Sequence, residues 1–411
     1  MSILSHIFKK QSKRVYLDYA STTPLDPRVI KAMKVSGLFA NPSSLYEEAV
    51  AVSKKIAEAR TDIARALGGH ADEIVFTSGG TESNNLALRG VVEASFEKEP
   101  FRKNQKIPHI VTSVIEHSSI LETCRDLEKS GQAEVTYVPA GADGRVDPSE
   151  IKKSIRPETI LISIMYVNNE IGTIQPIKEI AKIVREERKK RGEESTTTLY
   201  FHTDACQAAL YCPLGVPQLG VDMLTLDASK TYGPKGSGLL FVRRGVEIKP
   251  IITGGGQERG LRSGTENLAG IIGLATALKI ADAEKEKEIL RVWKLRDYLL
   301  KKILEIKPKV RSNISNDHNT EIAPNFINVC FPGSDAEYLV LQLDVKGFCV
   351  SSVSSCRTVS EDSSSYVIEA VRRSDPTAVD CSKSSLRITL GRYTKKPDIE
   401  AFLKAIAQII Y

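Results

Sequence analysis

Lys230 is placed where a lysine could do covalent chemistry. It follows an apolar run at 223–226 and precedes a turn rich in glycine and proline at 231–238. Desolvation at the end of a buried strand lowers the pKa of an amine, so a lysine there is suited to form a Schiff base with a carbonyl cofactor. An exposed loop lysine is the alternative, and this residue alone does not decide between the two.

A second pattern, residues 77–83, could cradle a phosphate. It follows the apolar run 74–76 and opens a helix-like stretch, with glycines at its centre and a hydroxyl on Thr81. The first N–H groups of a helix can bind an anion, and glycines let a ligand approach the backbone closely. Any strand-to-helix turn favours glycine, however, so Gly80 and Thr81 are candidates only.

Three further polar residues each follow an apolar, strand-like run, namely His117, Asn169 and Asp204. A carboxylate at the C-terminal edge of a parallel sheet faces the usual ligand crevice and could keep a pyridine nitrogen protonated. An imidazole could stack on a planar ring and shuttle protons, and an amide suits a ring hydroxyl. Helix caps, core positions and turns are the alternatives. Taken in chain order with the cradle and the lysine, the set predicts a site for pyridoxal phosphate (PLP).

The elements that must position these residues alternate between apolar runs and amphipathic stretches from about residue 15 to 270. This alternation predicts an α/β domain on a mostly parallel mixed sheet. We expect strands near 74–76, 109–112, 159–164, 199–202, 223–225 and 238–242, and helices near 47–67, 82–97, 119–129 and 177–191. The predicted domains are a flexible N-terminal extension at 1–14, a large PLP-binding domain at 15–270, and a small C-terminal α+β domain at 271–411 that begins with long helices.

The composition of the chain excludes several classes of protein. The 411 residues carry a formal charge of +6 that is spread along the chain, so we expect no direct nucleic-acid binding. No stretch resembles a transmembrane helix or a signal peptide. The seven cysteines are odd in number and contain no CxxC pair, which argues against a disulfide framework or an intrinsic metal site and for a reducing cytoplasm. We expect all of them except Cys356 to be small core hydrophobes.

Ordered motifs along the chain resemble those of cysteine desulfurases of the NifS/IscS type. These are fold-type I PLP enzymes of the class V aminotransferase kind. The matching segments are 16–24, 41–44, 76–83, 116–117, 167–172, 203–207, 230–236, 254–260, 262–265 and 385–391. The resemblance implies the PLP-dependent transferase fold of type I, a homodimer, and L-cysteine as the substrate.

The resemblance also implies a role for each candidate residue. Lys230 would bind PLP and abstract the Cα proton of the substrate, His117 would stack on the ring, and Asp204 would pair with the ring nitrogen. Asn41 and Arg387 would hold the carboxylate of L-cysteine. The other cofactor contacts would come from Gly80, Thr81, Asn169, Gln207, Ser229 and, across the dimer, Thr265.

Cys356 would be the second nucleophile, on a serine-rich loop at 351–365 that we expect to be mobile. Its thiolate would take the substrate sulfur as a persulfide and leave alanine. The sulfur would then pass to an acceptor protein for iron–sulfur cluster assembly or tRNA thiolation. The same thiol could ligate an iron–sulfur cluster transiently.

Three positions depart from the usual pattern of this family. Asp227 and Ser229 stand where the family has Ser and His, and Val353 stands where it has Gly. An ionised Asp227 would repel a phosphate, so we expect it to point away or to pair with a nearby Lys or Arg. Val353 excludes positive φ and should restrict the loop. Three alternatives stay open, namely a selenocysteine lyase, another fold-type I PLP enzyme, or a catalytically weakened scaffold dimer, and these departures support the scaffold dimer.

Overall fold

The computed structural model describes residues 14–35, 37–102, 106–192, 197–314, 321–352, 364–374 and 380–409. Contacts divide the chain into two compact units, which are described separately below. The larger unit holds residues 22–169 and 173–286, and the smaller unit holds the N-terminal residues up to 21 together with 170–172 and 287–411. The division at 286 lies beyond the bound of 270 expected from the sequence, because the helix α8 (Leu268–Ile306) continues through both positions.

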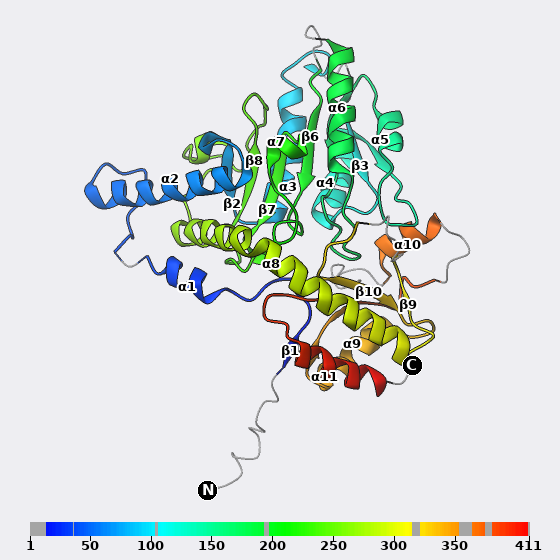
Figure 1. The fold of residues 1–411 in the computed structure, drawn as a ribbon. Coiled ribbons are helices and arrows are strands. Elements are labelled where there is room, and N and C mark those ends of the chain that lie inside the picture. Colours follow the sequence, from blue (N-terminus) through cyan, green and yellow to red (C-terminus); the bar gives the residue numbers. More distant parts are fainter. Residues whose placement is uncertain are drawn as a thin grey trace. The chain divides into compact units, whose positions relative to one another are not determined.

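The larger unit is built on a seven-stranded mixed sheet in the order β2-β8-β7-β6-β5-β3-β4 (Figure 1). Only β8 runs antiparallel to its neighbours in this sheet, and the other pairs are parallel. The predicted α/β class with a mostly parallel mixed sheet is therefore confirmed. The strands are β2 (Ile74–Thr77), β3 (His109–Ser113), β4 (Glu134–Val138), β5 (Thr159–Ser163), β6 (Tyr200–Asp204), β7 (Met223–Asp227) and β8 (Gly238–Val242).

Helices cover this sheet, and its central strands are buried on both faces. The strands β3, β5 and β6 are buried along their whole length, as expected for parallel strands between helical layers. Leu86 and Val91 of α3 pack in one core cluster with Ile110, Leu161 and Met223 of the sheet. The helices of this unit are α1 (Pro27–Met33), α2 (Glu47–Leu67), α3 (Gly80–Ser95), α4 (Ser118–Lys129), α5 (Pro148–Ser154), α6 (Ile177–Arg191), α7 (Val216–Leu219) and the first half of α8.

The sheet brings polar residues to its C-terminal edge. Asp204 is the last residue of β6, and Asp227 is the last residue of the neighbouring β7. His117 follows β3 and immediately precedes α4. Lys230 ends the 3-10 turn Ala228–Lys230, which follows β7 without a break. The strand topology therefore determines where each candidate residue lies.

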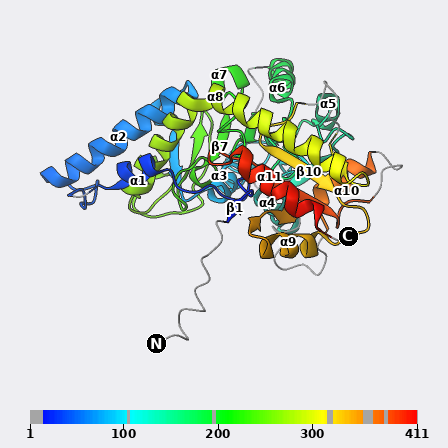
Figure 2. The same cartoon turned by 60° about the horizontal axis from the view of Figure 1, so that its bottom comes forward.

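The smaller unit is an α+β fold, in agreement with the expectation for the C-terminal part of the chain. Its antiparallel sheet has the order β12-β13-β10-β9, and β1 pairs with β11 in a separate parallel ribbon. The helix α11 lies beside the second half of α8 in both views (Figure 1, Figure 2), where the Lys396 ammonium is 5.4 Å from the centroid of the Tyr298 ring. The elements are β1 (Val15–Tyr16), β9 (Arg311–Ser312), β10 (Phe326–Cys330), α9 (Ala336–Val345), β11 (Phe348–Cys349), β12 (Ser351–Ser352), α10 (Tyr366–Arg373), β13 (Ser385–Thr389) and α11 (Lys396–Ala407).

One expectation about the cysteines is wrong. Cys330 and Cys381 form a buried disulfide with their Cα atoms 5.5 Å apart. Cys330 ends β10, and Cys381 lies just before β13, its antiparallel neighbour, so sheet pairing brings together two residues that are 51 positions apart in sequence. Cys124 and Cys212 are buried free thiols, as expected, whereas Cys206 and Cys349 are only partly buried.

Candidate active site

The start of α3 forms a backbone cradle. Gly79, the residue before the helix, has φ +153° and ψ −176°, a conformation that only glycine adopts readily. A Cβ on Gly79 would lie 3.1 Å from Oδ2 of Asp227, so a side chain would also crowd this approach. Gly80 then begins the helix and is buried, while Thr81 is exposed in the first turn. The two glycines thus keep the N-terminus of α3 open to close backbone contact.

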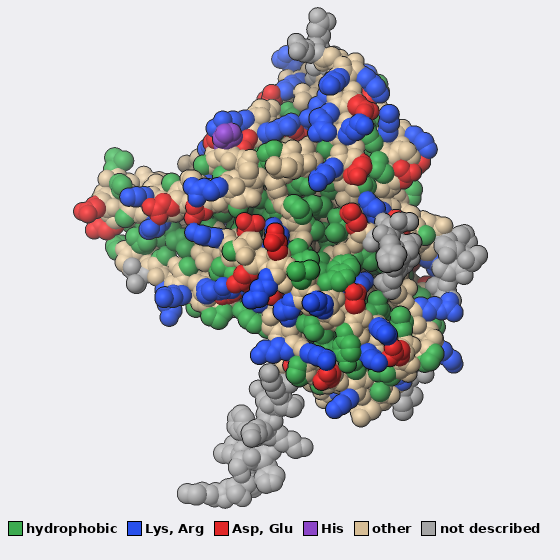
Figure 3. Space-filling model, in the orientation of Figure 1, with side chains coloured by type: hydrophobic (Ala, Val, Ile, Leu, Met, Phe, Trp, Pro, Cys, Tyr) green, Lys and Arg blue, Asp and Glu red, His purple; other side chains and the backbone are tan. Residues whose placement is uncertain are grey.

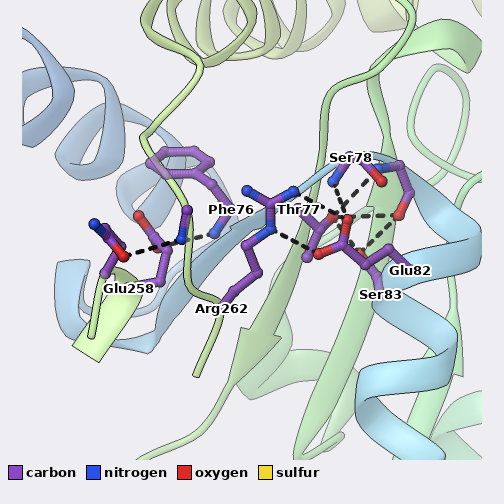
Figure 4. Close-up of polar contacts among 10 residues, drawn as sticks. Phe76, Thr77, Ser78, Glu82, Ser83, Glu258 and Arg262 are labelled. Atoms are coloured by element: carbon purple, nitrogen blue, oxygen red, sulfur yellow. Dashed lines mark hydrogen bonds and ion pairs between the residues drawn. The ribbon is translucent and has the colours of Figure 1, made fainter. Parts of the chain in front are cut away.

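An ion pair flanks this cradle. Nε of Arg262 donates to Oε1 of Glu82 at 2.8 Å, and the backbone N–H of Ser78 donates to Oε2 of the same carboxylate at 2.8 Å (Figure 4). Burial pushes the pKa of Glu82 upward, but the hydrogen bonds from Arg262 and Ser78 outweigh it, so the pKa is lowered. Glu82 is therefore an anion whose charge Arg262 balances.

A chain of hydrogen bonds links Asp204 to His117. The Asn84 amide nitrogen, on α3, donates to Oδ2 of Asp204 at 2.7 Å and to the Ser119 hydroxyl at 2.8 Å. That hydroxyl lies 2.8 Å from Nδ1 of His117. We call these four residues the Asp204–His117 network. Sequence reasoning missed Asn84 and Ser119, since both lie inside helices and only the fold reveals what they contact.

His117 is held as a neutral imidazole in one orientation. Its Nδ1 accepts the backbone N–H of Ser119 at 3.1 Å and so caps α4, which leaves the ring proton on Nε2. Burial lowers the pKa of His117, and the charge of Lys230 lowers it further, against the opposing effects of Asp204 and Asp227. The helix-cap reading of His117 is therefore correct, and it does not conflict with a role at the ring.

The turn that carries Lys230 is anchored by the segment before α1. The Ser229 carbonyl accepts the Thr23 backbone N–H at 2.7 Å and the Thr23 hydroxyl at 2.9 Å. Lys230 lies within electrostatic reach of both His117 and Cys206. The lysine, the imidazole and the Asp204 carboxylate thus belong to one site at the sheet edge.

The structure contradicts the expectation that Asp227 points away from the cradle. Its Oδ2 accepts the backbone N–H of Gly80 at 3.0 Å, and its Oδ1 accepts the N–H of Ser229 at 2.7 Å. It forms no ion pair with a Lys or Arg among the residues that the structure describes. Two backbone donors therefore take the place of the cation that we had expected as its partner.

Two neighbours of this site were not identified from the sequence. Glu116 is fully buried and accepts the Ser113 hydroxyl at 2.6 Å and the Met165 N–H at 3.0 Å. Burial raises the pKa of Glu116 to about 8, and nearby Asp204 adds to the effect. Burial also raises the pKa of the Cys206 thiol well above its usual value, with Asp204 and Asp227 contributing.

The remaining candidates lie in different settings. Asn169 is buried after β5, and Gln207 is partly buried three residues after Asp204. Asn41 and Thr265 are exposed. In the smaller unit, Arg387 on β13 is buried and donates to the Asp18 carboxylate at 2.9 Å and to the Ser21 hydroxyl at 2.6 Å. Cys356 and Val353 lie outside the described residues.

The comparisons with known proteins agree with this geometry. The family model for aminotransferase class-V matches residues 15–402. The chain belongs to that family. The cysteine desulfurase IscS of Dictyoglomus turgidum is 44% identical over 400 residues, which are 97% of this chain and 95% of that protein. The cysteine desulfurase IscS of Methanosarcina thermophila is 42% identical, with 97% and 93% covered. A solved structure titled NifS-like protein has a TM-score of 0.84 at 34% identity and covers 96% of this chain and 98% of its own.

These relatives confirm the predicted resemblance to NifS/IscS-type proteins, the fold class and the cofactor, because class V aminotransferases are PLP enzymes. The described residues of this class V chain fit the ring end of PLP. Asp204 is a buried carboxylate fixed by Asn84 and by the Cys206 N–H at 3.0 Å, which suits a protonated ring nitrogen. At the phosphate end, the glycine cradle fits an anion, but Asp227 already occupies the N–H of Gly80.

Proposed function

We propose that this protein is a PLP-dependent cysteine desulfurase that converts L-cysteine to L-alanine and stores the sulfur as a Cys356 persulfide. The observation that carries the proposal is the Asp204–His117 network next to Lys230, in a chain whose relatives at 42–44% identity are named cysteine desulfurases. A buried carboxylate, a neutral imidazole and a lysine at one sheet edge are the groups that amino-acid chemistry on PLP requires.

PLP, when bound, supplies an electron-withdrawing ring that weakens the bonds at Cα and Cβ of an amino acid. Lys230 would hold the cofactor and accept the Cα proton on Nζ. Asp204, fixed by Asn84, would keep the ring nitrogen protonated. His117 would lie against the ring and present Nε2–H, because Nδ1 is committed to Ser119.

The remaining residues would bind either the substrate or the cofactor. Asn41 and Arg387 would bind the substrate carboxylate, for which a bidentate guanidinium is well suited. Cys356 would attack the substrate sulfur; the S–Cβ bond breaks, the thiolate becomes a persulfide, and alanine leaves after protonation. The remaining cofactor contacts would come from Gly80, Thr81, Asn169, Gln207, Ser229 and Thr265.

A homodimer is part of the proposal. Large apolar side chains are exposed around the start of α2, and patches of this kind mark interaction surfaces. Phe39 is 84% exposed, Leu45 is 95% exposed and Val50 is 55% exposed, and hydrophobic side chains are visible along this helix in Figure 3. Thr265 is also exposed, as a residue that completes a neighbouring subunit's site would be.

The proposal extends to the setting of the enzyme. The sulfur acceptor would be an iron–sulfur scaffold or a tRNA-thiolation protein, and the compartment would be the cytoplasm. Among the described helices, none has the length and apolar character needed to cross a membrane. We also propose the domain roles predicted from the sequence. The large domain at 15–270 would bind PLP, and the small domain at 271–411 would carry the cysteine loop 351–365.

A selenocysteine lyase is the second candidate, because the proposed site would accept either chalcogen. The test is product release from L-cysteine and from L-selenocysteine, with PLP and a reductant. We expect equimolar alanine and sulfide from L-cysteine, and loss of both in Cys356→Ala. The matched control is Cys349→Ala, which changes a partly buried thiol of the same unit outside the loop.

The outcomes separate the candidates. Alanine from L-selenocysteine alone, unchanged in Cys356→Ala, would favour the lyase. No product from either substrate, with the cofactor absorbance retained in native protein and absent in Lys230→Ala, would contradict both candidates and favour the scaffold dimer.

A further inference from the structure

The phosphate cradle of this chain already holds a carboxylate. Asp227 Oδ2 accepts the Gly80 N–H at 3.0 Å. Gly80 is the first residue of α3, a helix of 16 residues, so this N–H is one of the donors that a helix terminus offers to an anion. We propose that Asp227 competes with the cofactor phosphate for the N-terminus of α3 and weakens the contribution of the phosphate to cofactor binding. The inference rests on the proposed function only in taking PLP as the ligand.

No ion pair among the described residues balances the charge of Asp227. Glu82, the other carboxylate at the start of α3, is paired with Arg262 at 2.8 Å. Asp227 has no such cationic partner among the described residues. Its charge acts to raise the pKa of both His117 and Cys206. Lys230 lies close by, but its amine would be committed to the cofactor.

A phosphate at this position meets a like charge. A phosphate monoester carries about −1.5 to −2 charges at pH 7, and like charges at close range disfavour each other. The phosphate can therefore take the Gly80 N–H only by displacing the carboxylate.

Asp227 also has a local structural role that a test must preserve. Its Oδ1 caps the 3-10 turn Ala228–Lys230 by accepting the Ser229 N–H at 2.7 Å. Asn and Ser are cap residues as good as Asp, so Asp227→Asn and Asp227→Ser retain the cap and remove the charge. Asp126→Asn is the matched control, because Asp126 is an exposed carboxylate on α4 that pairs with Arg89.

The experiment compares two cofactor probes that differ only in the phosphate. Full-length protein freed of cofactor is titrated with PLP and, separately, with pyridoxal, and binding is followed by absorbance. Lys230→Ala supplies the background from other lysines. We expect both Asp227 variants to bind PLP at least about tenfold more tightly than native protein, and to bind pyridoxal within about twofold of it. Asp126→Asn should match native protein with both probes.

Three outcomes would overturn the inference. The first is an unchanged or weaker affinity for PLP in both Asp227→Asn and Asp227→Ser, when both variants unfold at the same temperature as native protein. The second is an equal gain for pyridoxal, which would place the effect at the ring. The third is an equal gain in Asp126→Asn, which would indicate net charge alone. Because binding is read by absorbance, a protein that binds as expected but releases no alanine would refute the proposed function and leave this inference intact.

Discussion

Glu116 allows a test of the electrostatics beneath the active site. It is fully buried, and burial raises its pKa to about 8 from an ordinary 4.5. At neutral pH the folded protein therefore keeps a proton that the unfolded chain has lost. The side chain contributes its full stability below pH 4.5, and that contribution is lost as the pH rises through the window to about 8.

The size of the effect follows from the two pKa values. Each pH unit within the window removes about 1.4 kcal/mol, so about 3 kcal/mol is lost by pH 7 and about 5 kcal/mol by pH 8, as an upper estimate. Glutamine has nearly the same shape, does not ionise, and retains an oxygen for the Ser113 hydroxyl and the Met165 N–H. Glu116→Gln should therefore remove the pH dependence without removing these hydrogen bonds.

The assay is thermal unfolding of cofactor-saturated protein at a fixed concentration from pH 5 to pH 9. At about 2 °C per kcal/mol for units of this size, Glu116→Gln should gain about 6 °C on native protein between pH 5 and pH 7. Glu122→Gln, on the exposed face of α4, is the control and should give no trend. A constant difference between Glu116→Gln and native protein across this range would refute the reasoning, since it would mean that Glu116 is ionised in the folded state.

Three further predictions concern the site and the smaller unit. Asn84→Ala should weaken PLP binding by about tenfold or more in an absorbance titration, because it removes the amide that donates to Asp204 at 2.7 Å. Asn85→Ala is the control, and an equal loss of PLP affinity in both variants would argue against a specific role for Asn84. Thiol titration of denatured protein should find five thiols before reduction and seven after it, because two of the seven cysteines form the Cys330–Cys381 disulfide. Seven thiols in both samples would disprove this disulfide. Val353→Gly should raise the rate of persulfide transfer from Cys356 to an acceptor thiol, because glycine frees the backbone, and an unchanged rate would show that this position does not limit the loop.

The strands that could be predicted from the sequence were those that are buried along their whole length. The runs that became β5 and β8 are buried along their whole length and have consecutive apolar residues at their centres, so each showed as a short hydrophobic segment. The edge strand β4 (Glu134–Val138) was missed because most of its side chains are partly exposed, and its sequence contains no continuous apolar run. Helix α2 was located at its observed bounds, since a periodic apolar stripe ends at Gly68, which adopts the left-handed conformation at the C-terminus.

Side-chain partners at the site were harder to predict than positions, and Asp227 shows why. The sequence placed it at the end of a strand, three residues before Lys230, and the chemistry of a phosphate site made an inward carboxylate look unfavourable. That reasoning counted cations as the only partners that could hold the charge. In the structure, two backbone N–H groups do so instead, one from its own turn and one from a helix that begins 147 residues earlier in the chain. Backbone donors carry no signature in a sequence, so a carboxylate that substitutes for an anion at a helix terminus becomes visible only once the fold has brought the strand end and the helix start together.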